Sequence, residues 1–326
     1  MGPISRLYGP LLPPPQIWQD PIPNRTHVLI DTSDLTNIKQ NILKTDLTLS
    51  QLVRTAWSSA STYRCTDHRG GANGARIALE PQKSWHVNNI QSNELDHVLS
   101  TLKRIQLDFN TRPERRYDGK YISLADLIII GGSVGIEKAS NRTVPTSLGR
   151  MDASQSQTDI ESFQYLEPKF DAFRNYISPH FATSASDGVP IEYEMLLDRA
   201  YMLRLTPSEM TVLIGGLRVL NANANESSQY GVFTTDSSKL TNDFFVNLLD
   251  MDTIWKKHNG VYVGTCRDSS TWKATSIDLL FGSHSELRSV VEYYACDGMM
   301  DVFVDDFIKA WCKVMDLDRF DLRRGL

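Results

Sequence analysis

The segment LSQLVRTAWSSASTYR, residues 49–64, carries the clearest structural signal in the chain. Its apolar side chains recur every three or four residues, which is the spacing that buries one face of an α-helix. An arginine, Arg54, precedes Trp57 by three residues, and Ser58 follows the tryptophan directly. The segment therefore predicts a helix with a buried face, formed by Leu52, Val53, Ala56, Trp57 and Ala60.

Helical spacing extends outward from this segment over most of the chain. It recurs in residues 92–109 and in two segments that open with N-capping patterns, 123–132 and 206–220. The second of these begins with TPSE, which supplies a threonine N-cap, a proline at the first helical position and a glutamate at the third. Strand signals are short and few. The sequence thus predicts an all-α protein of roughly ten helices with little β structure.

Two glycine pairs lie inside these apolar helical segments, Gly131–Gly132 and Gly215–Gly216. Each glycine destabilises a helix interior by about 1 kcal/mol relative to alanine. We therefore expect another helix or a flat ligand to approach closely at both pairs.

Length and composition exclude several classes of protein. The chain has 326 residues, 41% hydrophobic and 22% charged, as is typical of globular domains. The net charge of −5 lacks the basic excess of nucleic-acid-binding proteins. Four scattered cysteines predict neither a disulfide framework nor a metal site. No transmembrane run and no apolar signal segment are evident, so we expect a cytoplasmic protein that binds no nucleic acid, membrane or metal.

The first 25 residues differ from the rest of the chain. Their dense prolines remove backbone donors and prevent helix formation. We expect residues 1–25 to form a linker or arm, with Ile17 and Trp18 docked on a neighbouring surface. A disordered linker is the alternative interpretation. Residues 26–326 are expected to form the folded domain.

Several dense motifs point to one family. They include AWSSASTYR at 56–64, RGGANGARIALEPQKSW at 69–85, SLADLIIIGG at 123–132 and EMTVLIGGLRVL at 209–220. From Met1 to about Leu322 the chain resembles the C-terminal half of catalase-peroxidases, bifunctional class I enzymes of the plant-type haem peroxidase superfamily. The resemblance implies a haem-peroxidase-like fold. It also implies descent from a duplication, in which the N-terminal copy binds haem b and the C-terminal copy lacks cofactor and supports it.

The resemblance further implies where the distal catalytic positions fall. Active copies carry Arg-x-x-Trp-His on one helix, and here Arg54 and Trp57 match while Ser58 replaces the histidine. Peroxide cleavage needs a base that titrates near neutrality and a cation to stabilise the developing charge. A serine hydroxyl is not a base at neutral pH without an activating partner. We therefore expect no catalytic residue in this chain.

The proximal positions are also altered. Active copies carry Gly-Gly-His, whereas this chain reads Gly215-Gly216-Leu217, and leucine cannot ligate the haem iron. By the same resemblance, Phe233 falls at the position of the proximal tryptophan. Asp278 falls at the aspartate that hydrogen-bonds the proximal histidine in active copies. We therefore expect no cofactor-binding residue.

Catalase activity in the family depends on a covalent Met-Tyr-Trp cross-link. Trp57 matches its tryptophan, the loop that carries the tyrosine is missing, and Arg204 falls nearest the methionine position. Trp57 is therefore expected in the core. Because a buried guanidinium needs a carboxylate partner, we expect Arg54 to pair with an acid such as Asp278 or to reach solvent.

The resemblance implies a function in oxidative-stress defence. We expect a haem-free, non-catalytic domain that supports the N-terminal haem-bearing copy of a catalase-peroxidase, which removes hydrogen peroxide. The contact surface is expected at residues 7–23 and 316–322, and a homodimer is left open. One alternative is a stand-alone haem peroxidase or catalase with unusual ligands. Another is a free-standing interaction protein that oligomerises through the surface another copy would cover.

Overall fold

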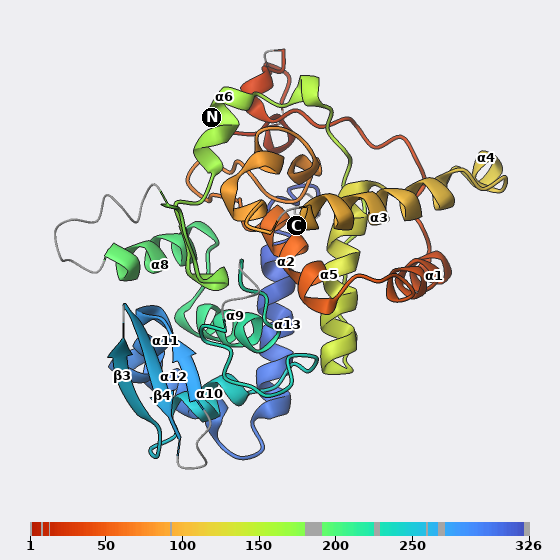
Figure 1. The fold of residues 1–326 in the computed structure, drawn as a ribbon. Coiled ribbons are helices and arrows are strands. Elements are labelled where there is room, and N and C mark those ends of the chain that lie inside the picture. The colour runs from red at the N-terminus through yellow and green to blue at the C-terminus, as the bar shows by residue number, and fades with distance from the viewer. Residues whose placement is uncertain are drawn as a thin grey trace. The chain divides into compact units, whose positions relative to one another are not determined.

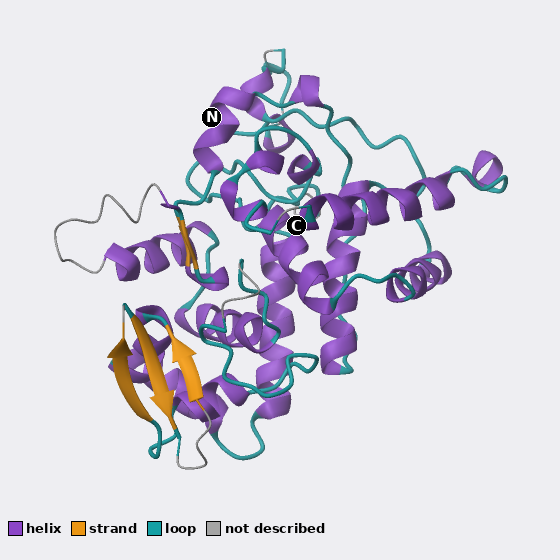
Figure 2. Cartoon of the chain, in the orientation of Figure 1, coloured by secondary structure: helices purple, strands orange, loops and turns teal. Residues whose placement is uncertain are grey.

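The computed structural model describes residues 2–7, 9–12, 14–91, 93–179, 191–224, 229–258, 260–266 and 271–322. Helices dominate this part of the chain (Figure 1; Figure 2), which confirms the predicted all-α class. The α-helices are α1 (Thr32–Leu43), α2 (Leu49–Ala60), α3 (Glu94–Asn110), α4 (Arg115–Asp118), α5 (Leu124–Ser140), α6 (Ile160–Phe163), α8 (Ile191–Met202), α9 (Pro207–Val219), α10 (Asp243–Leu248), α11 (Ser276–Ser283), α12 (Ser285–Ala295) and α13 (Met300–Met315). None is long and apolar enough to cross a membrane, as far as the described residues extend.

The β structure is small, as predicted. Strands β1 (Phe170–Asp171) and β2 (Tyr176–Ile177) form an antiparallel pair. Strands β3 (Ile254–His258), β4 (Val261–Thr265) and β5 (Thr271–Ala274) form an antiparallel sheet in the order β3-β4-β5.

Two compact units make up the chain. The first contains residues 1–137, 143–167 and 312–326, and the second contains residues 138–142 and 168–311. The first unit is thus assembled from segments that lie before and after the second unit in the sequence. The predicted boundary between residues 1–25 and 26–326 stays a prediction.

Helix α2 of the first unit begins and packs as its sequence predicts. The hydroxyl of Thr48 accepts a hydrogen bond from the backbone N–H of Gln51 at 3.2 Å, and the Gln51 side chain accepts one from the N–H of Thr48 at 3.0 Å. This capping box satisfies two donors that a helix start leaves free. Helix α5 approaches α2 closely, since a Cβ added at Gly135 would lie 2.9 Å from the Val53 side chain.

One buried arginine joins early and late segments of the first unit. Arg150 has no exposed surface. Its guanidinium donates to Asp126 at 3.2 Å, to the carbonyl oxygen of Met315 at 2.8 Å and to Asp316 at 2.7 Å. The end of the chain therefore completes the charge pairing of a residue in the middle of the sequence.

Helix α9 of the second unit also begins as predicted, with Thr206 at the N-cap and a capping box to Glu209. Two other helices approach its glycine pair closely, which confirms the first of the two expected explanations. A Cβ at Gly215 would overlap the ring of Phe245 in α10, and a Cβ at Gly216 would overlap the ring of Phe307 in α13. Aromatic side chains of the chain itself therefore occupy the space that these two glycines leave.

Candidate functional site

The distal positions lie on α2, in the first unit. Arg54 is buried, and its Nε donates to Oε1 of Glu94, at the start of α3, at 3.1 Å. A second guanidinium nitrogen also contacts that carboxylate. The prediction that Arg54 pairs with an acid is confirmed, but the acid is Glu94 rather than Asp278. The charge of Arg54 is thus balanced by a carboxylate within its own unit.

Trp57 and Ser58 are buried on the same helix. Trp57 has no exposed surface, which confirms its predicted place in the core. The Ser58 carbonyl oxygen accepts a hydrogen bond from the Gln82 side chain at 3.0 Å. A buried serine hydroxyl at the position of the distal base can donate or accept a hydrogen bond, but it is not protonated near neutral pH as an imidazole is.

The proximal positions lie in the second unit and centre on an ion pair. Leu217, on α9, has no exposed surface. The next residue, Arg218, donates from Nε to Oδ1 of Asp278 at 2.8 Å, and both side chains are fully buried. The other carboxylate oxygen of Asp278 accepts from the N–H and the hydroxyl of Thr275, at 2.8 and 2.9 Å. Asp278 therefore bonds an arginine and caps α11.

The other two guanidinium nitrogens of Arg218 also form hydrogen bonds. They bond the carbonyl oxygens of Phe173 and Ala172, at 2.9 and 2.7 Å, and the Asn175 side chain at 2.8 Å. The backbone at Gly231 also packs closely against this ion pair, since a Cβ there would lie 2.6 Å from both Arg218 and Asp278. Burial of a guanidinium is tolerated when its hydrogen bonds are satisfied in this way. Arg218 was missed by the sequence reasoning, although it directly follows the altered ligand position.

Phe233 belongs to an aromatic cluster of the second unit. Its ring stacks on that of Phe244, with centroids 5.2 Å apart, and it lies 5.5 Å from Trp255 of β3 and 6.1 Å from Trp272 of β5. The ring has no exposed surface. The position of the proximal tryptophan is thus filled by a side chain that packs the three-stranded sheet. Arg204, at the implied methionine position, is exposed at the end of α8.

The proline-rich arm is fixed to the first unit by an ion pair. Asp20 and Arg69 are both buried and form two hydrogen bonds, of 2.8 and 2.9 Å. Burial lowers the pKa of Arg69, but the hydrogen bond and the charge of Asp20 outweigh burial, so its pKa is raised. Ile17 and Trp18, the predicted anchors, are 53% and 37% exposed. The buried anchor of the arm is therefore polar, and those two apolar side chains face solvent.

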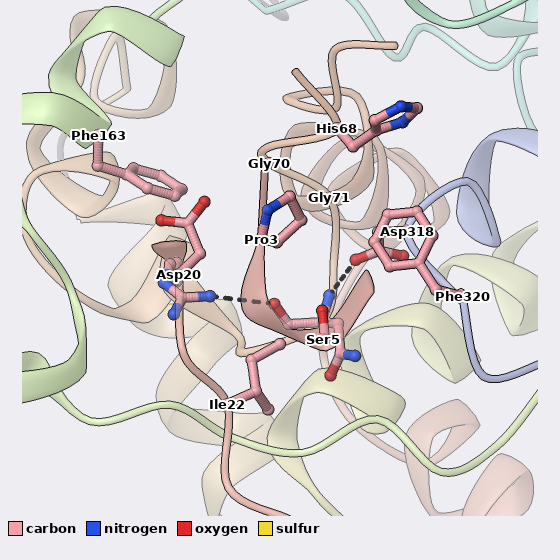
Figure 3. A pocket seen from close by; sticks show the side chains of 12 residues that line it. Pro3, Ser5, Asp20, Ile22, His68, Gly70, Gly71, Phe163, Asp318 and Phe320 are labelled. Atoms are coloured by element: carbon pink, nitrogen blue, oxygen red, sulfur yellow. Dashed lines mark hydrogen bonds between the residues drawn. The ribbon is translucent and has the colours of Figure 1, made fainter. Parts of the chain in front are cut away.

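A small cavity with a mixed polar and apolar lining lies where the arm, the glycine-rich loop and the C-terminal tail of the first unit meet (Figure 3). Its volume of about 20 Å³ has room for a single water molecule. Asp318 accepts a hydrogen bond from the N–H of Asn73 at 2.6 Å, and burial raises the pKa of its carboxyl. Arg76 donates to the Pro21 carbonyl oxygen at 2.9 Å, and burial lowers its pKa. The cavity joins three distant parts of the sequence.

Comparison with known proteins identifies the family. The chain matches the family model of peroxidases over residues 35–297. It belongs to the peroxidase family. It is 52% identical to a catalase-peroxidase of Marinomonas sp. (strain MWYL1) and 52% identical to one of Clostridium botulinum (strain Alaska E43 / Type E3), each over 99% of this chain. A catalase-peroxidase of Rhodococcus jostii (strain RHA1) is 51% identical over the same share.

The peroxidase family assignment confirms the resemblance and the haem-peroxidase-like fold inferred from the motifs. The chain spans only 43–44% of the length of these catalase-peroxidases. Similarity therefore covers nearly all of this chain and less than half of each relative.

Proposed function

We propose that this chain is a haem-free, non-catalytic peroxidase domain that supports a haem-bearing catalase-peroxidase copy in removing hydrogen peroxide. The observation that carries the proposal is the buried Arg218–Asp278 pair beside Leu217. The carboxylate that would orient a proximal histidine is bonded to a guanidinium, and the ligand position holds an alkyl side chain. An oxidative-stress role and a cytoplasmic location remain predictions.

Haem does not fit the residues at the proximal positions. Leu217 has no lone pair to offer iron, which haem peroxidases bind through a proximal histidine. The carboxylate of Asp278 accepts hydrogen bonds from Arg218 and Thr275, which gives it a structural role. Phe233 has no indole N–H and packs among other aromatic rings.

The distal positions support the same conclusion. Cleavage of a peroxide O–O bond requires a proton acceptor that can return the proton to the leaving oxygen. Ser58 offers a hydroxyl instead of an imidazole, and the positive charge of Arg54 is already paired with Glu94. Their arrangement suits packing within the first unit better than catalysis.

We propose that the haem-bearing partner copy binds at an apolar surface beside the arm. Arg69 links the arm to α6, because it bonds Asp20 and also donates to the carbonyl oxygen of Ser162 at 3.4 Å. The arm and the α6 region together expose large apolar side chains, as surfaces that bind other proteins do. They are Leu11, Ile17, Trp18, Ile160 and Tyr165.

A haem titration of the purified chain, followed in the Soret region with peroxide turnover assayed on the same sample, tests the absence of catalysis. We expect no stoichiometric Soret band and no turnover from a protein with a helical circular dichroism spectrum. A sharp, stoichiometric band with catalase or peroxidase activity would contradict the proposal. It would favour the alternative, a stand-alone haem enzyme with unusual ligands.

Binding to a separately expressed haem-bearing catalase-peroxidase copy tests the support role. We expect Trp18→Ala to weaken this association by at least about tenfold, since exposed tryptophans often dominate interfaces. Leu107→Ala, at another exposed apolar side chain of the first unit, is the matched control. Equal affinity of the two variants would show that the arm is not part of the interface. Sedimentation of the chain alone would show whether it forms a homodimer.

A further inference from the structure

Strand β3 has an open edge. It pairs with β4 on one side, over its full length from Ile254 to His258. The opposite edge of the sheet is covered, because the N–H of Gly231 donates to the carbonyl oxygen of Lys273 in β5 at 2.8 Å. No such backbone partner lies along the outer edge of β3 among the described residues (Figure 1). An edge of this kind can accept another strand.

The strand is held rigidly from its inner face. Trp255 lies 5.5 Å from the buried ring of Phe233, and Trp272 of β5 lies 6.1 Å from the same ring. Because side chains alternate along a strand, Ile254 and Lys256 point to the opposite face. Ile254 is 64% exposed and Lys256 is also exposed. The strand therefore contacts the aromatic cluster through Trp255, while Ile254 and Lys256 are exposed on its other face.

Positive charge is concentrated on this sheet. Across the outer face, Lys256 of β3 and Lys273 of β5 both stand beside Val263 of β4. Lys257 lies on the other face, with its ammonium 5.7 Å from the centre of the Tyr262 ring. No ion pair joins any of these lysines to an acidic residue in the part of the chain that the structure describes. The whole chain nevertheless has a net charge of −5. Lys256 and Lys257 thus place two positive charges along β3, one on each face of the sheet.

These lysines discriminate between candidate occupants of the edge. Two-fold antiparallel pairing of β3 with β3 of a second copy about its centre would place Lys256 opposite Lys256. Like charges directly opposite each other destabilise a strand pair, and opposite charges stabilise it. The sequence of β3 therefore disfavours a second copy and favours a strand that carries carboxylates.

We infer that the outer edge of β3 binds an extended acidic segment of a partner protein, which adds to the sheet as a fourth strand. Main-chain hydrogen bonds along residues 254–258 supply the affinity in this mode of recognition, and side chains select the sequence. Because side chains alternate along a strand, carboxylates at every second position of the added strand lie on one face of the sheet, where they are opposite Lys256 or, in the other register, opposite Lys257. This inference goes beyond the proposed function and does not depend on the absence of haem.

A fluorescein-labelled peptide of alternating Glu and Val residues is the probe, and fluorescence anisotropy with the full chain is the measurement. We expect binding that weakens as salt is added, and at least tenfold weaker binding to the variant Lys256→Glu/Lys257→Glu. The matched control is Lys44→Glu/Lys103→Glu, which reverses two exposed lysines of the first unit and is expected to bind as the unmodified chain does. A peptide of alternating Lys and Val is expected not to bind.

Amide hydrogen exchange distinguishes strand addition from diffuse attraction. We expect the Glu–Val peptide to slow exchange within residues 254–258 and to leave α12 unchanged. Three results would overturn the inference: no binding of the Glu–Val peptide, equal binding of the Lys–Val peptide, or binding that survives Lys256→Glu/Lys257→Glu. A concentration-dependent dimer that protects the same amides would assign the edge to a second copy instead.

Discussion

The guanidinium of Arg218 lies 2.8 Å from Oδ1 of Asp278, and neither side chain has any exposed surface. The resemblance to catalase-peroxidases implies that Asp278 occupies the position of the aspartate that bonds the proximal histidine in active copies, and in this chain that carboxylate forms an ion pair instead. Hydrogen bonds to Thr275 and to the carbonyl oxygens of Ala172 and Phe173 complete this pair. The proximal region of the second unit is therefore organised around a buried charge pair.

Removing one partner of this pair should strongly destabilise the second unit. We expect Arg218→Met to lower the free energy of unfolding by about 3–5 kcal/mol, because it leaves Asp278 buried without its cation. Urea denaturation followed by circular dichroism measures the change. Arg288→Met, in the exposed pair with Glu292, is the control and should change stability by less than about 1 kcal/mol. Equal effects of the two variants would contradict a stabilising role for the buried pair.

Gly216 should not tolerate a methyl group. A Cβ there overlaps the Phe307 ring, and overpacking of a core destabilises by about 1–3 kcal/mol. We therefore expect Gly216→Ala to lower the thermal midpoint, and Phe307→Leu to restore part of the loss when the two are combined. Gly282→Ala is the control, since its Cβ would meet Leu248 no closer than 3.3 Å. An unchanged thermal midpoint of Gly216→Ala would show that α13 shifts easily at this point.

The arm should loosen when Asp20 loses its charge. Asp20→Asn leaves the Arg69 guanidinium buried without a carboxylate, and breaking a buried pair in this way destabilises by about 3–5 kcal/mol. We expect faster amide exchange in residues 16–22, measured by mass spectrometry. Asp301→Asn, which removes an exposed partner of Arg142, should leave exchange in the arm unchanged. Unaltered protection in Asp20→Asn would mean that other contacts hold the arm.

Asp318 predicts a pH dependence of stability. Burial raises the pKa of its carboxyl above the ordinary value of 3.8, so the folded state binds a proton more readily than the unfolded state does. The contribution of this carboxyl to the free energy of unfolding is therefore fully present below pH 3.8, and it is lost as the pH rises through the raised pKa.

The variant Asp318→Asn tests this sign, because an amide oxygen can still accept from the N–H of Asn73. We expect the free energy of unfolding of the variant, relative to that of the unmodified chain, to increase as the pH rises above 3.8. Urea titrations of both proteins at a series of pH values measure the difference. A difference that falls with pH would show that the pKa of Asp318 is lowered instead.

Local signals in the sequence predicted the helices well. The apolar spacing of residues 49–63 corresponds to α2, and the TPSE pattern marks the start of α9 at Pro207. Both signals act within a few residues, so they need no knowledge of the tertiary structure. Close approach of another helix at the glycine pair 215–216 was one of two expectations, but the contacting residues could not be predicted, because Phe245 and Phe307 approach it only after α10 and α13 have packed.

Charge partners of the candidate site could not be read from the sequence. Arg54 and Glu94 lie on different helices, and Arg218 and Asp278 are separated by most of the second unit's strands. The need of a buried arginine for a carboxylate was predictable, but the choice among many acids depends on the fold. The same limit applies to the arm. Its apolar residues predicted Trp18 as an anchor, but the buried anchor is the ion pair of Asp20 with Arg69.

The order of the segments in the first unit has a consequence for synthesis. Arg150 emerges from the ribosome before the whole of residues 168–311, and its partner Asp316 emerges only after them. At cellular rates of translation this delay is on the order of ten seconds. During that time the nascent first unit has only Asp126, one of the two carboxylates that pair with the buried guanidinium of Arg150. A chain that stops before Asp316 never gains the second carboxylate, so we expect such a product to be directed to chaperones and proteases.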